Sequence, residues 1–403
     1  MMFLDTLKHI FGRATIIGIN QAAVLISLPI LASRLDFYTF GQVAIGFLLV
    51  QLSWVISDWG IQNYSIEIWS NFRDRLQKSK FISYAVMLNL LIAIIFLILI
   101  LILSRLSILS FPFHYWLCVI PSILMGSVYP LWFYQVQKSP QDMILPTFIS
   151  RLIFLGMIFA LVVNNETASW AFLAQGVNLS LITIYAFLRM CKNYSYKWQT
   201  PNISEIKALA QSSFPFLVNS ITNNQINTLW GFGLSLVSGP YAMAIYNFGD
   251  QVYRAGGAIT NIIAQSVRIY FQGKSLIQIR FTFLFFICLF VLITAFMIII
   301  GPFFIKTFFP KSFLPAIEVY QVMMLAWGLH ALVKLLNYPI LGETHGANWV
   351  NQMTYLILIL HVVSILAWMY FFDGPFSLAM MLTLVITIQL IIYLTQLLRS
   401  IRK

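Results

Sequence analysis

Charged residues are scarce in this sequence. Only 9% of its 403 residues are Asp, Glu, Lys or Arg, and 60% are hydrophobic, whereas soluble globular domains average about 25% charged residues. Cysteine is also rare. The sequence contains three cysteines, Cys118, Cys191 and Cys288, and they are far apart. Their spacing indicates neither a disulfide framework nor a metal site. The composition therefore excludes a soluble globular protein and favours a membrane protein.

Long polar segments are missing as well. The longest polar connections, at 61–80, 191–207 and 268–280, are too short to form a separate catalytic domain. The chain has no nucleotide-binding P-loop, so we do not expect ATP as the direct energy source, and we expect no cofactor. The amino-terminal segment runs into the first apolar stretch without a small-residue cleavage motif, so we expect no cleaved signal peptide.

Apolar segments recur from one end of the chain to the other. Each is close to the roughly 20 residues that a helix needs to cross the hydrocarbon core of a bilayer. The sequence therefore predicts an all-α polytopic membrane protein. We expect about twelve transmembrane helices, at residues 10–33, 40–60, 81–104, 112–137, 142–163, 168–190, 208–236, 240–267, 280–301, 314–338, 348–371 and 376–398.

The distribution of Lys and Arg predicts the orientation in the membrane. In a membrane protein, the net charge of +12 is explained by orientation in the bilayer and by contact with lipids, rather than by binding to nucleic acid. Outside the spans, nearly all basic residues fall on the side of the amino terminus. The exceptions on the opposite side are Arg34, Arg105, Lys306 and Lys311. The positive-inside rule then places both termini in the cytoplasm.

The chain also shows signs of an internal duplication. Residues 40–46, which open the second predicted span, resemble residues 242–247 in the eighth, and both segments follow a polar helix and a short turn. We therefore predict an N-terminal six-helix bundle at residues 1–200 and a C-terminal six-helix bundle at residues 201–403. Secondary transporters built from parallel repeats place the substrate site at the repeat interface.

The first predicted helix of each half is unusually polar. The first half offers Asn20 and Gln21, and in the second half Asn219, Asn223 and Asn227 recur every four residues on one helical face. Two interpretations remain open. The amides either hold neighbouring helices together or line a water-filled cavity that suits a hydroxyl-rich substrate.

Ionisable side chains inside the predicted spans mark a candidate functional site. A charge at the bilayer centre costs about 2.5–3.5 kcal/mol on the insertion scale, so such residues face a partner or an aqueous cavity. Asp250 and Arg254 are four residues apart on one helical face, which makes them either a self-neutralising structural pair or part of a binding site. The other ionisable residues that we consider within or near the ends of spans are Arg151, Lys334, Asp58 and His330.

One motif resembles that of a known family. Residues 129–138, Tyr-Pro-Leu-Trp-Phe-Tyr-Gln-Val-Gln-Lys, resemble the Pro-x-Trp-x-Phe-Gln-Gly-x-Glu-x-Met pattern of the polysaccharide repeat-unit (O-antigen, Wzx-type) flippases. Residues 57–60, Ser-Asp-Trp-Gly, look like the end of that family's second helix. The family belongs to the multidrug/oligosaccharidyl-lipid/polysaccharide exporter superfamily. Val136 and Gln137 depart from its usual Gly and acid, and Asn227 and Thr228 stand where an acid-base pair is often found.

The resemblance implies two six-helix bundles around a central cavity. It also implies alternating-access export of polyprenyl-pyrophosphate-linked oligosaccharide repeat units across the bacterial inner membrane, for O-antigen, lipopolysaccharide or capsule synthesis. Membrane lipids would surround the protein, and the polymerase and chain-length proteins of the same pathway would be its partners.

A pyrophosphate needs cations along its path, preferably Arg, whose planar fork matches phosphate oxygens. We therefore assign substrate binding to Arg151, Arg254, Asp250, Lys334, Asn223 and Asn227. We assign ion coupling to Asp58 and His330, and no residue to catalysis. For Lys334, which lies near the end of its span, snorkelling to the membrane surface is the alternative.

Three other functions can be compared with repeat-unit export. A multidrug cation antiporter of the same superfamily would need acids in its cavity, and the predicted spans contain few. A membrane-embedded polysaccharide polymerase would carry a long outer loop with catalytic charges, whereas the outer loops here are short. A peptidoglycan-lipid flippase usually has additional spans. The sequence therefore predicts a transporter rather than an enzyme.

Overall fold

The computed structural model describes residues 2–106, 108–109, 111–222, 226–271 and 276–402. The regular elements in these ranges are helices. Ten helical segments of the described chain are long and apolar enough to cross a membrane. The predicted class, an all-α polytopic membrane protein, is confirmed.

Contacts within the chain divide it into two compact units, Met1–Ile221 and Thr222–Lys403. The sequence-based division lies at 200/201, and the difference between the two is helix α9 (Ile203–Ser220). This helix packs against α3 (Ile61–Ile68) and α4 (Arg75–Arg105) of the first unit. The first unit therefore includes the segment that we expected to open the second bundle.

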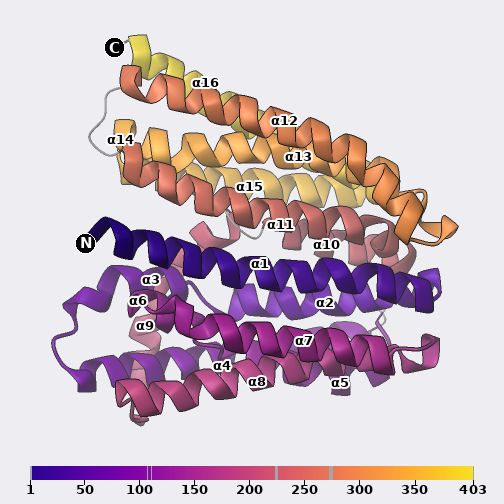
Figure 1. The fold of residues 1–403 in the computed structure, drawn as a ribbon, viewed down its shortest axis with the longest axis horizontal. Helices are drawn as coiled ribbons and strands as arrows, with labels where there is room; N and C mark the ends of the chain where they lie inside the picture. Colours follow the sequence, from indigo (N-terminus) through magenta and orange to yellow (C-terminus); the bar gives the residue numbers. More distant parts are fainter. Residues whose placement is uncertain (1, 107, 110, 223–225, 272–275, 403) are drawn as a thin grey trace. The chain divides into compact units, whose positions relative to one another are not determined.

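The first unit is built around α8, which packs against both α5 and α7 (Figure 1). Helix α7 also packs against α1. Helix α2 packs against α4 and α5. These contacts bring α1, α2, α5, α7 and α8 around one interior. The remaining bounds in this unit are α1 (Met2–Arg34), α2 (Phe37–Ser57), α5 (Trp116–Ser127), α6 (Leu131–Val136), α7 (Ile144–Leu161) and α8 (Ser169–Tyr194).

A sharp break separates α2 from α3. Trp59 and Gly60 have positive φ angles of 47° and 79°, a left-handed conformation that suits glycine. A Cβ atom on Gly60 would lie 2.4 Å from the Ser213 carbonyl oxygen of α9, so only glycine fits there. Trp59 Nε1 donates a hydrogen bond to the Ala210 carbonyl oxygen at 3.0 Å. The break thus provides the surface on which α9 docks.

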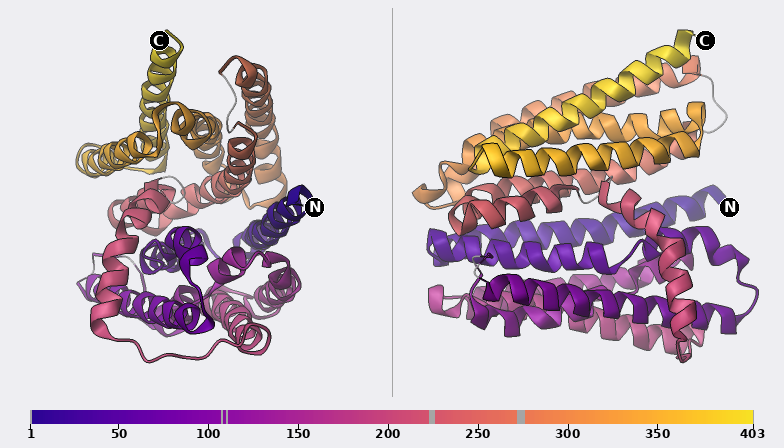
Figure 2. Two further views of the ribbon diagram at one scale, coloured as in Figure 1. Left: turned by 90° about the vertical axis from the view of Figure 1, so that its left-hand side faces the viewer. Right: turned by 180° about the vertical axis from the view of Figure 1, so that it is seen from behind.

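One expected span is divided between two observed helices, and another coincides with a helix of lower hydropathy. The expected span 208–236 is shared between α9 and α10 (Ile226–Val237), and residues 223–225 between them lie outside the described residues. Figure 2 shows α9 running crosswise to the long helices of its own unit, which suits a helix that carries Glu205 and Lys207 in its first two turns. The expected span 240–267 coincides with α11 (Gly239–Phe271), whose polar face lowers its hydropathy below that of the ten candidate spans.

The second unit is built around α13, which packs against α11, α12 and α16, while α10 packs against α11. Gly256 allows the close approach of α11 to α13, because a Cβ atom there would lie 2.5 Å from Trp327 Nε1. The polar residues of α11 are therefore held beside those of α13. The remaining bounds are α12 (Leu276–Phe308), α13 (Ala316–Leu336), α14 (Gly342–His345), α15 (Ala347–Phe371) and α16 (Pro375–Arg402).

The motif at 129–138 packs one end of the first unit. Trp132, Phe133 and Tyr134 are buried in an apolar cluster with Trp69, whose ring meets that of Trp132 edge-to-face at 6.2 Å. The Tyr134 hydroxyl donates a hydrogen bond to the Ala186 carbonyl oxygen of α8 at 2.6 Å. Trp132 and Tyr134 therefore act in packing here and do not present an aromatic surface for a sugar.

Candidate functional site

Arg151 lies on the buried face of α7, in the interior of the first unit, and is 7% exposed. Its Nε donates a hydrogen bond to Asn20 Oδ1 of α1 at 2.7 Å, and its Nη1 donates to Gln175 Oε1 of α8 at 3.1 Å. The guanidinium carbon lies 5.5 Å from the centre of the Phe154 ring. Three helices therefore fix the orientation of this cation.

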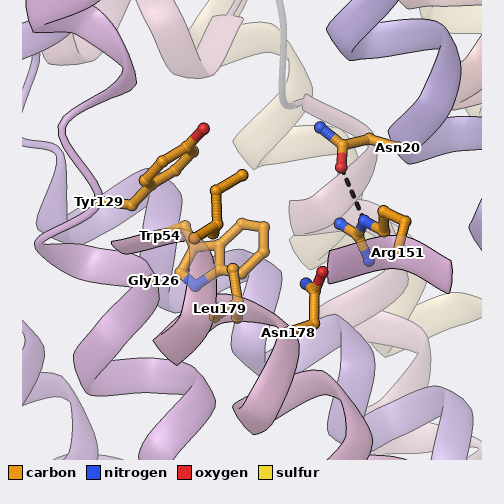
Figure 3. Close-up of a pocket in the computed structure, with 8 residues that line it drawn as sticks. Asn20, Trp54, Gly126, Tyr129, Arg151, Asn178 and Leu179 are labelled. Atoms are coloured by element: carbon orange, nitrogen blue, oxygen red, sulfur yellow. Dashed lines mark hydrogen bonds between the residues drawn. The ribbon is translucent and has the colours of Figure 1, made fainter. Parts of the chain in front are cut away.

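A cavity of about 60 Å³ lies beside Arg151. Figure 3 shows Arg151 with Asn20 and Asn178 nearby, and Trp54 and Tyr129 on the other side of the space. The Trp54 indole donates to the Ser122 carbonyl oxygen at 3.3 Å and lies against Gly126. Asn178 Oδ1 is buried and has no hydrogen-bond partner among the described residues.

The charge of Arg151 is not balanced within the described part of the chain, where the ion pairs involve other residues. Its hydrogen-bond partners are neutral amides. Removing a cation from water costs several kcal/mol unless an opposite charge or several hydrogen bonds compensate. This cavity is therefore suited to a negatively charged ligand.

The second unit holds the other predicted cluster, on α10 and α11. Arg254 Nε donates to Asp250 Oδ2 at 2.7 Å, and the two side chains are 8% and 3% exposed. Arg254 Nη1 donates to Thr228 Oγ1 at 3.0 Å, and Asn227 Nδ2 lies 3.5 Å from Asp250 Oδ1. The predicted i,i+4 pair thus exists within a network of four side chains.

Two atoms of this network remain unpaired. Arg254 Nη2 and Asn227 Oδ1 are buried without a hydrogen-bond partner among the described residues. A buried unsatisfied donor costs about 1–3 kcal/mol. The network therefore has a donor nitrogen on Arg254 and an acceptor oxygen on Asn227 left for a ligand, even while Asp250 and Arg254 remain joined.

His330 and Lys334 both lie buried on α13, one turn apart. The Tyr253 hydroxyl of α11 and His330 Nδ1 form a hydrogen bond of 2.6 Å. Lys334 reaches toward α11 as well, because a Cβ atom on Gly257 would lie 3.7 Å from its Nζ. Lys334 is 9% exposed and is directed toward a neighbouring helix of its own unit, which distinguishes it from a snorkelling lysine.

Asp58 has a local structural contact. It follows the last residue of α2, and its carboxylate accepts hydrogen bonds from the Gln62 backbone amide at 3.3 and 3.4 Å, in the first turn of α3. Such capping stabilises a helix start. The structure places this carboxylate at the break between α2 and α3, and Asp58 is not among the residues that line the Arg151 cavity.

Of the remaining expectations, Asn223 lies outside the described residues. Trp230 is fully buried, and its indole donates a hydrogen bond to His361 Nδ1 at 3.0 Å. Trp54 differs from Trp230 in that it lines the Arg151 cavity. The sequence did not identify Gln175 as a partner of Arg151. The only signal for this role was the presence of a polar residue in an apolar span.

Comparisons with known proteins agree with this architecture. The model of a family described as "Polysaccharide biosynthesis protein" matches residues 6–269. A comparison with the curated proteins finds no significant match.

Solved structures share the fold over nearly the whole chain. The chain is similar to a structure of the lipid II flippase MurJ in an inward closed conformation, with a TM-score of 0.68, 14% identity, and coverage of 98% of this chain and 87% of that chain. It is similar to an inward-facing multidrug resistance MATE family transporter of the MOP superfamily, with a TM-score of 0.67, 10% identity, and 94% coverage of each chain.

A third similar structure is a MOP superfamily transporter from Pyrococcus furiosus, whose binding pocket is described as having reverse polarity. Its TM-score is 0.59 at 12% identity, with coverage of 98% of this chain and 95% of that chain. These likenesses establish the shared fold. The chain belongs to the polysaccharide biosynthesis protein family and shares the fold of the MurJ and MATE structures.

Proposed function

We propose that this protein is a flippase that moves polyprenyl-pyrophosphate-linked oligosaccharide repeat units from the cytoplasmic to the outer leaflet of a bacterial inner membrane, by alternating access. The observation that carries the proposal is Arg151, a buried cation whose partners are neutral amides. The family match supports a role in polysaccharide synthesis, and the similar MurJ structure is that of a protein named a lipid II flippase.

The diphosphate of such a substrate supplies the charge that Arg151 lacks. Asn20 and Gln175 occupy Nε and Nη1, so Nη2 is left to donate to a phosphate oxygen. Hydrogen bonds between a guanidinium and a phosphate are short and roughly twice as strong as neutral ones. Asn178 Oδ1, which has no partner among the described residues, is available to a sugar hydroxyl.

Arg254, in the second unit, offers the diphosphate a separate cation on its path in this scheme. Asp250 holds Nε when the site is empty, which avoids leaving a lone charge within the membrane. The unpaired Nη2 contacts the arriving phosphate first. Binding that differs between the inward-open and outward-open states then shifts the population between them.

The observed carboxylates disfavour the alternative of a multidrug cation antiporter. A cationic drug needs an acid that is free to bind it. Asp250 is joined to Arg254, and Asp58 caps the start of α3. The buried positive charge of Arg151 would repel such a drug.

Complementation of a strain that lacks its own repeat-unit flippase tests the proposal, with surface polysaccharide as the readout. We expect Arg254→Ala to abolish export at near-normal abundance in the membrane. Asp250→Asn should be milder, because it removes the resting partner and keeps the phosphate ligand. Arg189→Ala is the control, since it removes an arginine of the first unit that pairs with Asp142 outside both clusters.

The exchange Asp250→Arg with Arg254→Asp separates a ligand from a structural pair. It keeps an ion pair and moves the cation by one turn, about 6 Å along the helix. A folded, inactive protein agrees with contact between Arg254 and the substrate. Full export by the exchanged protein would show that the pair only holds helices together.

A further inference from the structure

A second and larger cavity lies at the end of the first unit where α4 begins and α8 ends. It encloses about 190 Å³, and its polar lining includes Arg75, Lys78, Ser79, Gln137, Asn193 and Ser195. No residue lines both this cavity and the one beside Arg151. A water molecule occupies about 30 Å³ in the liquid. The space therefore has room for a phosphate with a small polyol.

The wall formed by residues 193–196 is held in place by contacts with α4. The Tyr196 hydroxyl and Ser83 Oγ form a hydrogen bond of 2.9 Å, and the Gln199 backbone amide donates to the same Ser83 oxygen at 2.9 Å. Burial raises the pKa of Tyr196, so its hydroxyl stays protonated at neutral pH. Ser195 reverses the chain with φ of 55°. The cavity is therefore formed before any ligand arrives.

The floor of the cavity belongs to the family motif. Phe133 of α6 lines it together with Ile82 of α4. The Phe133 ring meets the Tyr194 ring edge-to-face, with centroids 5.1 Å apart. An apolar floor below a polar and basic rim suits a ligand that has a charged head and an apolar part.

The two cations of the rim have no acidic partner. Arg75 and Lys78 form no ion pair with the described residues, and the Lys78 ammonium lies 5.3 Å from the centre of the Trp69 ring. The neighbouring acids are engaged elsewhere. Asp74 accepts a hydrogen bond from the Gln77 backbone amide at 2.7 Å, and Asp142 pairs with Arg189 at 2.9 Å. The cavity therefore has a positive charge that a ligand can neutralise.

We propose that this cavity binds the phosphodiester headgroup of an anionic phospholipid. The candidate spans of α4 and α8 begin at Arg75 and end at Tyr194, so the cavity lies at the ends of two candidate spans, where the headgroups of a surrounding bilayer would come within reach. The phosphate contacts Arg75 and Lys78, and glycerol hydroxyls contact Gln137, Asn193 and Ser195. Basic pockets on the cytoplasmic side of membrane proteins recognise anionic lipids by this chemistry.

Native mass spectrometry of the purified protein, titrated with phosphatidylglycerol and separately with phosphatidylcholine, tests the site. We expect preferential retention of phosphatidylglycerol. Arg75→Gln with Lys78→Gln should weaken it roughly thirtyfold. Arg73→Gln with Lys80→Gln is the matched control, because it removes the same charge from the same segment at residues that do not line the cavity. Asn193→Trp, at an exposed position of the rim, should block binding without a change in charge.

Four results would overturn the proposal. Equal weakening by the two double variants would indicate diffuse attraction to a basic segment. Equal retention of phosphatidylcholine would exclude charge recognition. Efficient displacement by inorganic phosphate would identify a soluble phosphate as the ligand, and preference for farnesyl diphosphate would identify an isoprenoid diphosphate. Because this assay measures lipid retention and not export, its failure would leave the proposed transport function standing.

Discussion

Replacing Arg151 with methionine should separate function from stability. Methionine has a similar length and no charge, so it removes the hydrogen bonds to Asn20 and Gln175. Each bond to a charged group contributes about 1.5–3 kcal/mol, so the gross loss is roughly 3–6 kcal/mol. The substitution also removes the cost of burying an unbalanced cation, which is several kcal/mol. We expect the two effects to offset each other to within about 2 kcal/mol.

Export should respond very differently from stability. Losing two hydrogen bonds from a guanidinium to a diphosphate removes at least about 3 kcal/mol of interaction, which corresponds to roughly 100-fold weaker binding. Arg151→Lys keeps the positive charge but loses the planar guanidinium group that can donate two parallel hydrogen bonds, so we expect this variant to retain partial export. Arg189→Met removes the Asp142 ion pair and serves as the control for loss of a cation.

The assay combines thermal unfolding of the purified protein with surface polysaccharide measured in the complemented strain. We expect Arg151→Met to unfold within a few degrees of the wild type and to export almost nothing. Normal export by this variant would refute the assignment of Arg151 to the substrate. Loss of more than about 4 kcal/mol of stability would instead identify Arg151 as a structural residue.

Two further predictions concern orientation and packing. Reporter fusions after Lys80 and after Lys403 should both report the cytoplasm, because Lys and Arg accumulate on that side; an outside signal at either position would contradict the topology. Gly126→Val should lower the thermal stability by about 1–3 kcal/mol, because a Cβ atom there would lie 1.8 Å from Trp54 Nε1 and would displace the indole; an unchanged melting temperature would contradict this packing argument.

Some features follow from the sequence because they depend on local spacing. Apolar length identifies most spans, and the four-residue separation of Asp250 and Arg254 predicts their ion pair, which the structure contains at 2.7 Å. The assignment of these residues to substrate binding stays a prediction. The partners of Arg151 could not be predicted, because Asn20 and Gln175 are 131 and 24 residues away and meet it only through helix packing.

The packing of α9 could not be predicted in this way. Hydropathy alone favoured one span at 208–236, whereas the structure assigns part of this range to α9, which docks on the break around Gly60, and part to α10. That outcome depends on contacts between α9 and the first unit, which no local pattern encodes. The aromatic motif at 129–138 marked the family, but its burial against Trp69 depends on packing in the same way.

The most direct test of the proposed function is transbilayer movement in liposomes that contain the purified protein. A polyprenyl-diphosphate-linked oligosaccharide is placed in both leaflets, and the outward-facing fraction is followed with an impermeant sugar-modifying reagent. We predict that the wild-type protein gives the reagent access to nearly all of the lipid without lengthening its glycan, whereas Arg151→Met and Arg254→Ala leave the inner half protected. Protection of the inner half with the wild-type protein, or movement of a cationic drug in its place, would contradict the account.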